Sequence, residues 1–318
     1  MTNTSAPGGS YRIGQHEVAR IGYGAMQLDP ESSTGEDAVT LLRRAVELGV
    51  NHIDTASFYS GGEVNTRIRA ALSPYADDLV IVSKVGAKHV PGGVIPLAAA
   101  QKPAELRAAV EEDLAQLGLH QIHVVNLRRL DLGPGLRAEG DQLVDLDDQL
   151  AEMIALRDEG KIGAIGISAV PVETVVHAAS AGIVCVQNAY SLLDRSQEET
   201  LDFCLDNDIA WVPYFPLGSS FPGFPKVSNN PVVQRVASEL GATAAQIGLA
   251  WLLAHAPNTL LIPGTRSLAH LEENLATADV SLTAQQVADL DAVPAELAHG
   301  DGVEAFLDEV RTRDGAQS

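Results

Sequence analysis

The sequence predicts a single α/β domain folded as a (β/α)8 barrel. Eight short runs rich in Val and Ile are each followed by a stretch of helical period along the 318-residue chain. The apolar runs are nearly continuous rather than alternating, which is typical of parallel strands buried on both faces. Eight βα units in a chain of this length are what such a barrel needs, since about 250 residues suffice for one.

The predicted strands and helices alternate along the chain, with two helices after the seventh strand. The strands are expected at 18–24, 50–56, 78–85, 122–128, 162–170, 183–191, 209–217 and 259–265. The helices are expected at 35–49, 62–73, 103–118, 142–160, 172–182, 196–207, 231–242, 244–255 and 268–278. Several of these helices end on a glycine that can adopt the left-handed cap conformation, at Gly49, Gly118, Gly160 and Gly182.

The two ends of the chain add smaller features to the barrel. Residues 1–10 read as a disordered lead, and 11–318 as the barrel domain, beginning with a β-hairpin around Gly14. The tail beyond residue 281 holds two short helical patterns, a C-terminal helical extension expected to close over the barrel. The alternative is a doubly wound open sheet, but "IGYGAMQ" has only the first two glycines of a GxGxxG dinucleotide motif.

The composition excludes several classes of function. Acidic residues number 42 and basic residues 21, for a formal charge of −21, which argues against binding nucleic acid or anionic membrane. No apolar run approaches ~18 residues, and the N-terminus lacks the basic start and apolar core of a signal peptide, so we expect a cytoplasmic protein. Cys185 and Cys204 lie outside any metal-ligand spacing; we expect buried reduced thiols and no metal.

Three polar residues fall where neighbouring strands end. Asp54 closes the second strand, Tyr59 follows five residues later, and Lys84 closes the third strand. The carboxyl ends of parallel strands share one face of a barrel, so these side chains can converge there. A nearby ammonium favours the phenolate, which would make Tyr59 a tunable proton donor for carbonyl reduction. The alternative is a structural Asp–Lys ion pair with Tyr59 as packing.

Three long connections lie on the same predicted face. They span 86–102, 130–142 and 216–231, after the third, fourth and seventh strands. Long loops with Pro, Gly and aromatic residues at the C-terminal face of a barrel are typical of walls or lids over a substrate.

The motifs from residue 11 to 292 resemble the aldo-keto reductase family. "DTASFY" and Lys84 match the family's catalytic residues, "YFPLG" its nicotinamide-stacking segment, and "GTRSLAHLEEN" its phosphate and adenine clamp. The resemblance implies NADP(H) as cofactor. The cofactor-binding residues that it implies are Gly24, Ala25, Met26, Asp54, Ser168, Gln187, Tyr214, Phe215, Leu217, Gly218, Gly264, Thr265, Arg266, His270, Glu273 and Asn274.

Other separated segments resemble the bacterial pyridoxal reductases within that family. They are "GYGAMQL", "VNHIDT", "VVNLR", "FPLG", "AWLL" and "LLIPGT". This resemblance implies NADPH-dependent reduction of pyridoxal to pyridoxine. We separately expect a monomer or weak homo-oligomer. Two alternatives stay open: a carbonyl reductase of broader specificity, and an NADPH-binding sensor or partner subunit with little turnover.

The fourth strand departs from the family pattern. Where the family has a catalytic histidine, "IHVVNLRRLD" has Arg128. His123 is an odd number of residues away, so it should face the helix layer, and His120 precedes the strand at its other end. Arg128 cannot shuttle a proton, but its planar fork could span the aldehyde oxygen and the ionised ring hydroxyl of pyridoxal. The alternative is that Arg128 pairs with a carboxylate such as Asp131.

The segment after the eighth strand is the expected cofactor clamp. It runs into a helix, whose first backbone N–H groups can hold phosphate. Arg266 is suited to a 2′-phosphate because its guanidinium is planar and permanently charged. His270 stands where the family often has an arginine, and Glu273 and Asn274 would reach the adenine amino group. The alternative is a capped helix with a surface arginine.

Overall fold

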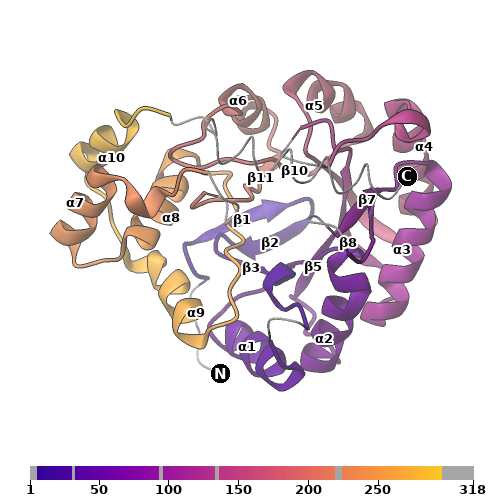
Figure 1. Ribbon diagram of the computed structural model, residues 1–318, viewed down its shortest axis with the longest axis horizontal. Coiled ribbons are helices and arrows are strands. Elements are labelled where there is room, and N and C mark those ends of the chain that lie inside the picture. The colour runs from indigo at the N-terminus through magenta and orange to yellow at the C-terminus, as the bar shows by residue number, and fades with distance from the viewer. Residues whose placement is uncertain (1–5, 31–32, 93–95, 133–135, 219–223, 296–318) are drawn as a thin grey trace.

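Seven strands form one parallel sheet that curls around the centre of the molecule (Figure 1). The computed structural model describes residues 6–30, 33–92, 96–132, 136–218 and 224–295. The strand order is β11-β10-β9-β8-β5-β4-β3. The strands are β3 (Tyr23–Gly24), β4 (His52–Asp54), β5 (Val80–Val85), β8 (Ile122–Arg128), β9 (Ile162–Ser168), β10 (Cys185–Gln187) and β11 (Ala210–Trp211).

Residues 259–261 supply the eighth strand and close the barrel. Thr259 bridges Trp211 at one edge of the sheet, and Leu261 bridges Ile21 at the other, both in parallel. Gly22 N donates to Leu261 O at 2.8 Å, so the first and last strands are hydrogen-bonded. The predicted (β/α)8 barrel is confirmed, although its eighth strand is held by isolated bridges rather than a continuous ladder.

The helices form an outer ring around the strands (Figure 1). Helix α4 begins at Leu146 rather than at the predicted 142, because the Asp145 carboxylate accepts from Asp147 N and caps it there. The α-helices are α1 (Gly35–Glu47), α2 (Glu63–Leu72), α3 (Pro103–Leu117), α4 (Leu146–Asp158), α5 (Val172–Ala178), α6 (Glu198–Asp206), α7 (Pro231–Leu240), α8 (Ala244–His255), α9 (Leu268–Leu275) and α10 (Ala284–Asp291). The short 3-10 helices are η1 (Ala25–Gln27), η2 (Tyr59–Gly62), η3 (Gly140–Gln142), η4 (Ala179–Ala181), η5 (Val227–Asn229) and η6 (Ala276–Asp279).

A β-hairpin plugs the N-terminal end of the barrel. Strands β1 (Ser10–Ile13) and β2 (His16–Ala19) pair across the predicted turn at Gly14, and Ile13 and Val18 are buried against the lumen. The boundary predicted at residue 11 falls inside β1. Pro7 is buried and its carbonyl accepts from Ile21 N at 3.1 Å, while residues 1–5 lie outside those described.

Two apolar layers hold the barrel. One fills the lumen with side chains from alternate strand positions, such as Val82, Val124 and Val212. The other lies between the outer strand faces and the helices and includes Ile81 and Val125. Because side chains alternate along a strand, one apolar run supplies both layers. The lumen is apolar toward the hairpin, so the polar side chains gather at the C-terminal end.

The long connections carry some structure of their own. The first contains the antiparallel pair β6 (Ala87–His89) and β7 (Leu97–Ala99). Residues 93–95, 133–135 and 219–223 of the three predicted loops lie outside those described. Helix α10 packs on α7 and α8 at the outer rim rather than over the barrel mouth, which corrects the expectation for the first part of the tail (Figure 1). The second predicted helical pattern lies outside the described residues.

Both cysteines are buried free thiols, as predicted. Burial raises the pKa of Cys204 to about 12, and burial is also the main cause that raises the pKa of Cys185. Among the described residues, no single helix is long and apolar enough to cross a membrane. Helices α7 and α8, bent by 95° at their break, meet that length and composition test only as a pair.

Candidate active site

Asp54, Tyr59 and Lys84 meet at the C-terminal end of β4 and β5. The Lys84 ammonium forms an ion pair with the Asp54 carboxylate and donates to Thr55 O at 2.9 Å and to the Tyr59 hydroxyl at 3.2 Å. The Asp54 and Lys84 residues are only 2% and 4% exposed. The convergence that the strand ends suggested is therefore present, with one ammonium touching both the carboxylate and the phenol.

The loop after β4 presents Tyr59 through an unusual backbone. Three residues in succession have positive φ: Ser60 at 49°, Gly61 at 62° and Gly62 at 89°. A side chain at Gly62 would collide with the Gln116 side chain on α3, with a Cβ only 1.9 Å from Gln116 Nε2. The glycines of "YSGGE" are thus required to turn the chain sharply after Tyr59 and start α2.

The electrostatics keep Lys84 charged despite its burial. Burial alone lowers the pKa of Lys84, but the combined attraction of Asp54 and Tyr59 raises it above the ordinary lysine value. Gln187 Nε2 donates to the second Asp54 oxygen at 2.6 Å, so each carboxylate oxygen has a partner. An ammonium held in this way places a fixed positive charge beside the phenol.

Arg128 ends β8 and lies beside this group without a carboxylate of its own. Its guanidinium carbon is 5.9 Å from the centroid of the Phe58 ring, and its Nε is buried with no hydrogen-bond partner. Asp131 pairs instead with Arg129 at 2.9 Å, which corrects the alternative that Arg128 takes that carboxylate. Within the described residues, no ion pair joins Arg128 to any acidic side chain.

The backbone of Arg128 is fixed by two residues that the sequence did not single out. Gln101 is buried, and its Nε2 donates to Gly86 O at 2.5 Å and to Arg128 O at 2.7 Å. Gly86 has a φ of 110°, and a Cβ there would lie 2.2 Å from Arg128 O. A glycine directly after the β5 strand was the available signal for this close approach, whereas nothing in the loop sequence marks Gln101.

Neither histidine of the β8 segment stands in for Arg128. His123 Nδ1 accepts from Ile81 N at 3.1 Å, and its ring packs edge-on against His16 of the hairpin, with 5.1 Å between centroids. It therefore lies against the hairpin rather than in the helix layer that we expected. His120 is exposed before β8.

An apolar wall borders the polar group at the C-terminal face. Phe58 is buried edge-on to Tyr59, with 5.3 Å between ring centroids. This cluster is completed by Ala56, Ala87, Leu97 and Leu136, which come from three loops. The phenol of Tyr59 thus borders a buried apolar cluster at this face.

The residues assigned to the cofactor also sit at strand ends on this face. Gly24 and Gly264 lie at the junction of the first and last strands, where a Cβ on Gly24 would be 2.5 Å from Ile262 O. Ala25 is buried and Met26 is 53% exposed in the 3-10 turn that follows. Ser168 ends β9, opposite Gln187 in β10.

The predicted stacking segment follows β11. Tyr214 is bridged to Ala189 and lies edge-on to Phe215, whose φ is 57°. Burial, which outweighs the nearby Arg128 charge, raises the pKa of Tyr214. Leu217 packs against the outer core, and a Cβ on Gly218 would lie 2.1 Å from Pro225 O.

In the predicted cofactor clamp, hydrogen bonds within the protein hold the backbone, but the Arg266 side chain is exposed. Tyr23 OH donates to Thr265 O at 2.5 Å, and Ser267 caps α9 by accepting from His270 N. Arg266 and His270 are exposed, and Asn274 is half-buried. Glu273 accepts from the Thr243 hydroxyl at 2.7 Å, so the carboxylate assigned to adenine has a protein partner.

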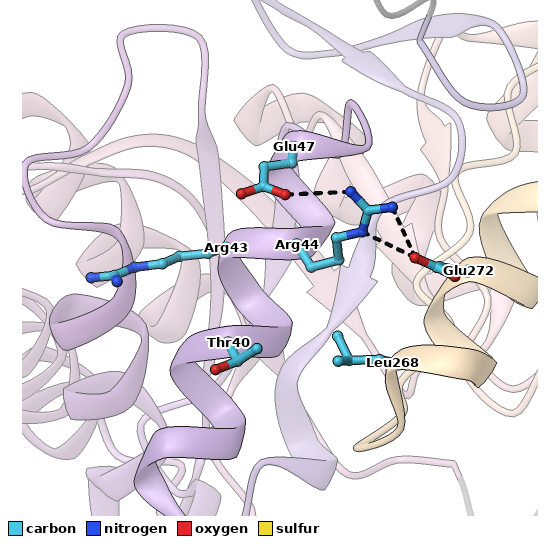
Figure 2. A pocket seen from close by; sticks show the side chains of 6 residues that line it. All are labelled: Thr40, Arg43, Arg44, Glu47, Leu268 and Glu272. Carbon is cyan, nitrogen blue, oxygen red and sulfur yellow. Dashed lines mark hydrogen bonds and ion pairs between the residues drawn. The ribbon is translucent and has the colours of Figure 1, made fainter.

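A separate hollow lies between α1 and α9 (Figure 2). Figure 2 shows Arg44 of α1 reaching across it to Glu272 of α9, at 2.9 Å, and to Glu47 of its own helix, at 3.4 Å. No predicted site residue lines it. The Arg44–Glu272 ion pair connects α9, the helix of the predicted cofactor clamp, to α1.

The comparisons with known proteins agree with this geometry. Residues 20–295 match the aldo/keto reductase family. The chain belongs to the aldo/keto reductase family. It is 41% identical to pyridoxine 4-dehydrogenase of Escherichia coli over 90% of this chain and 99% of that protein. An uncharacterised oxidoreductase of Schizosaccharomyces pombe is 33% identical over 89% of both.

A solved structure extends the comparison to the fold. The aldo-keto reductase from Klebsiella pneumoniae in complex with NADPH superposes with a TM-score of 0.73 at 27% identity, covering 89% of this chain and 93% of that one. The resemblance seen in the motifs is confirmed, and the chain is an oxidoreductase of this NADP(H)-using family.

Proposed function

We propose that the chain is an NADPH-dependent aldehyde reductase that converts pyridoxal to pyridoxine, with Tyr59 as the proton donor. The observation that carries the proposal is the buried Asp54–Lys84 pair in contact with the half-buried Tyr59, with Arg128 beside it and in no ion pair among the described residues. A sensor has no need for a phenol in contact with a buried ammonium, so this set favours turnover.

The residues of the cofactor site fit NADPH. Gln187 Oε1 is buried without a partner while its Nε2 holds Asp54, so the oxygen is available to accept from the nicotinamide amide. Arg266 is exposed at the start of α9 and has no ion pair among the described residues, which suits a 2′-phosphate. Gly24 and Gly264 allow the first and last strands to approach closely beside this site, because a Cβ on either would meet the backbone of the other strand.

The chain's own residues would complete the reduction. When bound, NADPH would supply the hydride for the carbonyl carbon. As negative charge develops on the carbonyl oxygen, the Tyr59 hydroxyl donates its proton there, and Lys84 stabilises the phenolate left behind. Asp54 offsets the Lys84 charge and fixes its position, with Gln187 holding the carboxylate in turn.

Arg128 would provide the preference for pyridoxal. Its fork carries donors at fixed spacing and stays charged, so it can bond the aldehyde oxygen and the neighbouring ring oxygenate together. Support comes from its buried Nε, which has no hydrogen-bond partner, from the apolar cluster around Phe58, and from the 41% identity to pyridoxine 4-dehydrogenase.

The direct test is NADPH oxidation with pyridoxal beside a panel of aldehydes. We expect pyridoxal to give the highest kcat/KM. If a benzaldehyde or an aliphatic aldehyde is reduced faster than pyridoxal, the protein is instead a carbonyl reductase of broader specificity. Tight NADPH binding with no turnover on any aldehyde would favour the sensor.

The two-oxygen role of Arg128 has its own test. Arg128→His and Arg128→Ala are compared on pyridoxal and on benzaldehyde, which lacks the ring hydroxyl. We expect the loss to be larger on pyridoxal by about tenfold or more, as for one lost charge-assisted bond. Equal losses on both substrates would contradict the role.

Two further expectations go with this proposal. We expect a monomer or weak homo-oligomer that acts on a small aldehyde, which sedimentation at several concentrations would test. A cytoplasmic location stays a prediction from the sequence, which fractionation of cells would test.

A further inference from the structure

A buried carboxyl in the helix layer is connected by hydrogen bonds to Asp54, Tyr59 and Lys84, which we call the proton-donor group. Asp113 lies on α3 and is fully buried. It occupies the apolar stripe of the helix, in line with Leu106, Val110 and Leu117. Among the described residues, only Asp113 and Asp54 are buried carboxyls.

Hydrogen bonds link Asp113 to Lys84 by two routes. On one side Asn65 Nδ2 donates to Asp113 Oδ1 at 2.6 Å, Thr55 Oγ1 donates to Asn65 Oδ1 at 2.7 Å, and Lys84 Nζ donates to Thr55 O at 2.9 Å. On the other side Ser83, the residue before Lys84 in β5, donates to Asp113 Oδ2 at 2.6 Å. These five residues, Thr55, Asn65, Ser83, Lys84 and Asp113, form a closed buried polar ring.

The ring joins three elements that must stay in register for the reaction. Thr55 follows Asp54, Ser83 precedes Lys84, and Asn65 lies on the helix that starts just after Tyr59. A shift of any of these elements would move the Lys84 ammonium relative to the Asp54 carboxylate or the Tyr59 hydroxyl. Because displacements of about 1 Å can cost two orders of magnitude in rate, a device that fixes this register matters to catalysis.

We propose that Asp113 is a positioning residue for proton donation: through the buried polar ring it fixes Lys84 against Asp54 and Tyr59, and its charge tunes how readily Tyr59 gives up its proton. The inference rests on the proposed function, since it assumes that Tyr59 is the donor. Asp113 itself touches neither substrate nor cofactor.

The charge of Asp113 changes in the physiological range. Burial raises the pKa of Asp113 to about 7, against the lowering effect of the Ser83 and Asn65 hydrogen bonds. The charged groups that act on it are Glu112 of its own helix and Lys84 of β5, while α2 contributes only the neutral Asn65. Above pH 7 the added negative charge near Lys84 disfavours the phenolate, so proton donation should slow.

Three variants separate positioning from stability. Asp113→Asn keeps the ring's shape without the charge, and Asp113→Ala breaks it. Asn258→Ala is the matched control: Asn258 is isosteric with aspartate, equally buried and hydrogen-bonded to Ile209 O, but lies before the eighth strand at the other end of the barrel. Each is assayed for kcat and KM with pyridoxal and with 4-nitrobenzaldehyde from pH 5.5 to 9, below its unfolding temperature, and for NADPH affinity.

The expected result is a split between kcat and binding. Asp113→Ala should lose between about 10- and 100-fold in kcat, with NADPH affinity changed less than twofold, while Asn258→Ala keeps its kcat. The wild type should show an inflection near pH 7 that Asp113→Asn lacks. Equal kcat losses in Asp113→Ala and Asn258→Ala, or an unchanged inflection in Asp113→Asn, would overturn the proposal.

A measurement without turnover checks the charge of Asp113 independently. A buried carboxyl with a raised pKa stabilises the fold in its neutral form, so this stability is lost as pH rises from about 4 through about 7. The urea midpoint of the wild type should therefore fall between pH 5 and pH 8 relative to Asp113→Asn. If the urea midpoints of the wild type and Asp113→Asn change with pH in the same way, the charge role of Asp113 is also overturned. If the wild type reduces neither aldehyde, the proposed function has failed. If it reduces them but Asp113→Ala and Asn258→Ala lose kcat equally, the positioning role of Asp113 has failed.

Discussion

The proton-donor group and the cofactor clamp are built in opposite ways. Asp54 and Lys84 are buried, and their polar atoms are bonded to other parts of the protein. In the clamp, Arg266 and His270 are exposed, and no ion pair holds Arg266 among the described residues. The first group is therefore held together by the protein alone, whereas Arg266 and His270, which we propose contact NADPH, are open to solvent. Changes in the first should act on kcat, and changes in the second on cofactor affinity.

The largest effect is expected from Lys84→Met. The substitution leaves the Asp54 carboxylate buried without its cation and removes the charge that supports the Tyr59 phenolate. We expect kcat to fall by about 10²–10³-fold, with the NADPH Kd changed less than a few-fold. Lys88→Met is the control, because Lys88 is an exposed lysine four residues further on. A similar loss in both variants would remove the distinction between the two regions.

Arg266→Ala should give the complementary result. Loss of one charge-assisted contact to a 2′-phosphate predicts a rise of about 10–100-fold in KM for NADPH, no change in KM for NADH, and little change in kcat. Steady-state kinetics with both cofactors measure it, and Arg235→Ala, an exposed arginine on α7, is the control. An equal rise for NADH would mean that Arg266 does not contact the 2′-phosphate.

Arg129→Ala tests whether the two adjacent arginines at the end of β8 have different roles. Arg128 forms no ion pair with the described residues, whereas its neighbour Arg129 donates to Asp131, to Gln149 Oε1 at 2.6 Å and to Val144 O. Losing these part-buried bonds should cost about 1 kcal/mol and lower Tm by roughly 2–4 °C, with kcat within about threefold. Thermal unfolding and kinetics on one preparation test this. A loss of kcat without a change in Tm would place Arg129 in the site.

The smallest effect is expected from Glu272→Gln. It removes the exposed ion pair by which Arg44 ties α9 to α1 (Figure 2). Exposed pairs contribute little and are screened by salt, so NADPH Kd should rise by less than about twofold, and only at low ionic strength. Titrations at two salt concentrations measure it. A large, salt-independent change would show that the tie shapes the clamp.

The sequence predicted the barrel because its strands carry apolar residues on both faces, which only a sheet covered on both sides can bury. It also predicted that Asp54, Tyr59 and Lys84 would meet, because neighbouring parallel strands end at one face. Contacts set by distant parts of the chain were not predictable. Gln187 reaches Asp54 across 133 positions of sequence, and Asp113 is buried only because α3 packs against β5 and α2.

Arg128 shows how far local reasoning extends. His123 lies outside the site, as expected, but the alternation of side chains along β8 predicted the helix layer for it, whereas its ring packs against His16 of the hairpin. The same reasoning could not decide which of two adjacent arginines takes Asp131, because that depends on how the chain turns after the strand. The structure pairs Asp131 with Arg129, and no ion pair involves Arg128 in the part of the chain that is described.

The central claim is that Tyr59 donates the proton in a site otherwise complete. Single-turnover reduction of pyridoxal by Tyr59→Phe, at saturating NADPH, tests it most directly. Phe keeps the packing against Phe58 and removes only the hydroxyl. The account predicts a rate lower by about 10²–10⁴-fold, with NADPH Kd within twofold of the wild type. A rate within threefold of the wild type would contradict it.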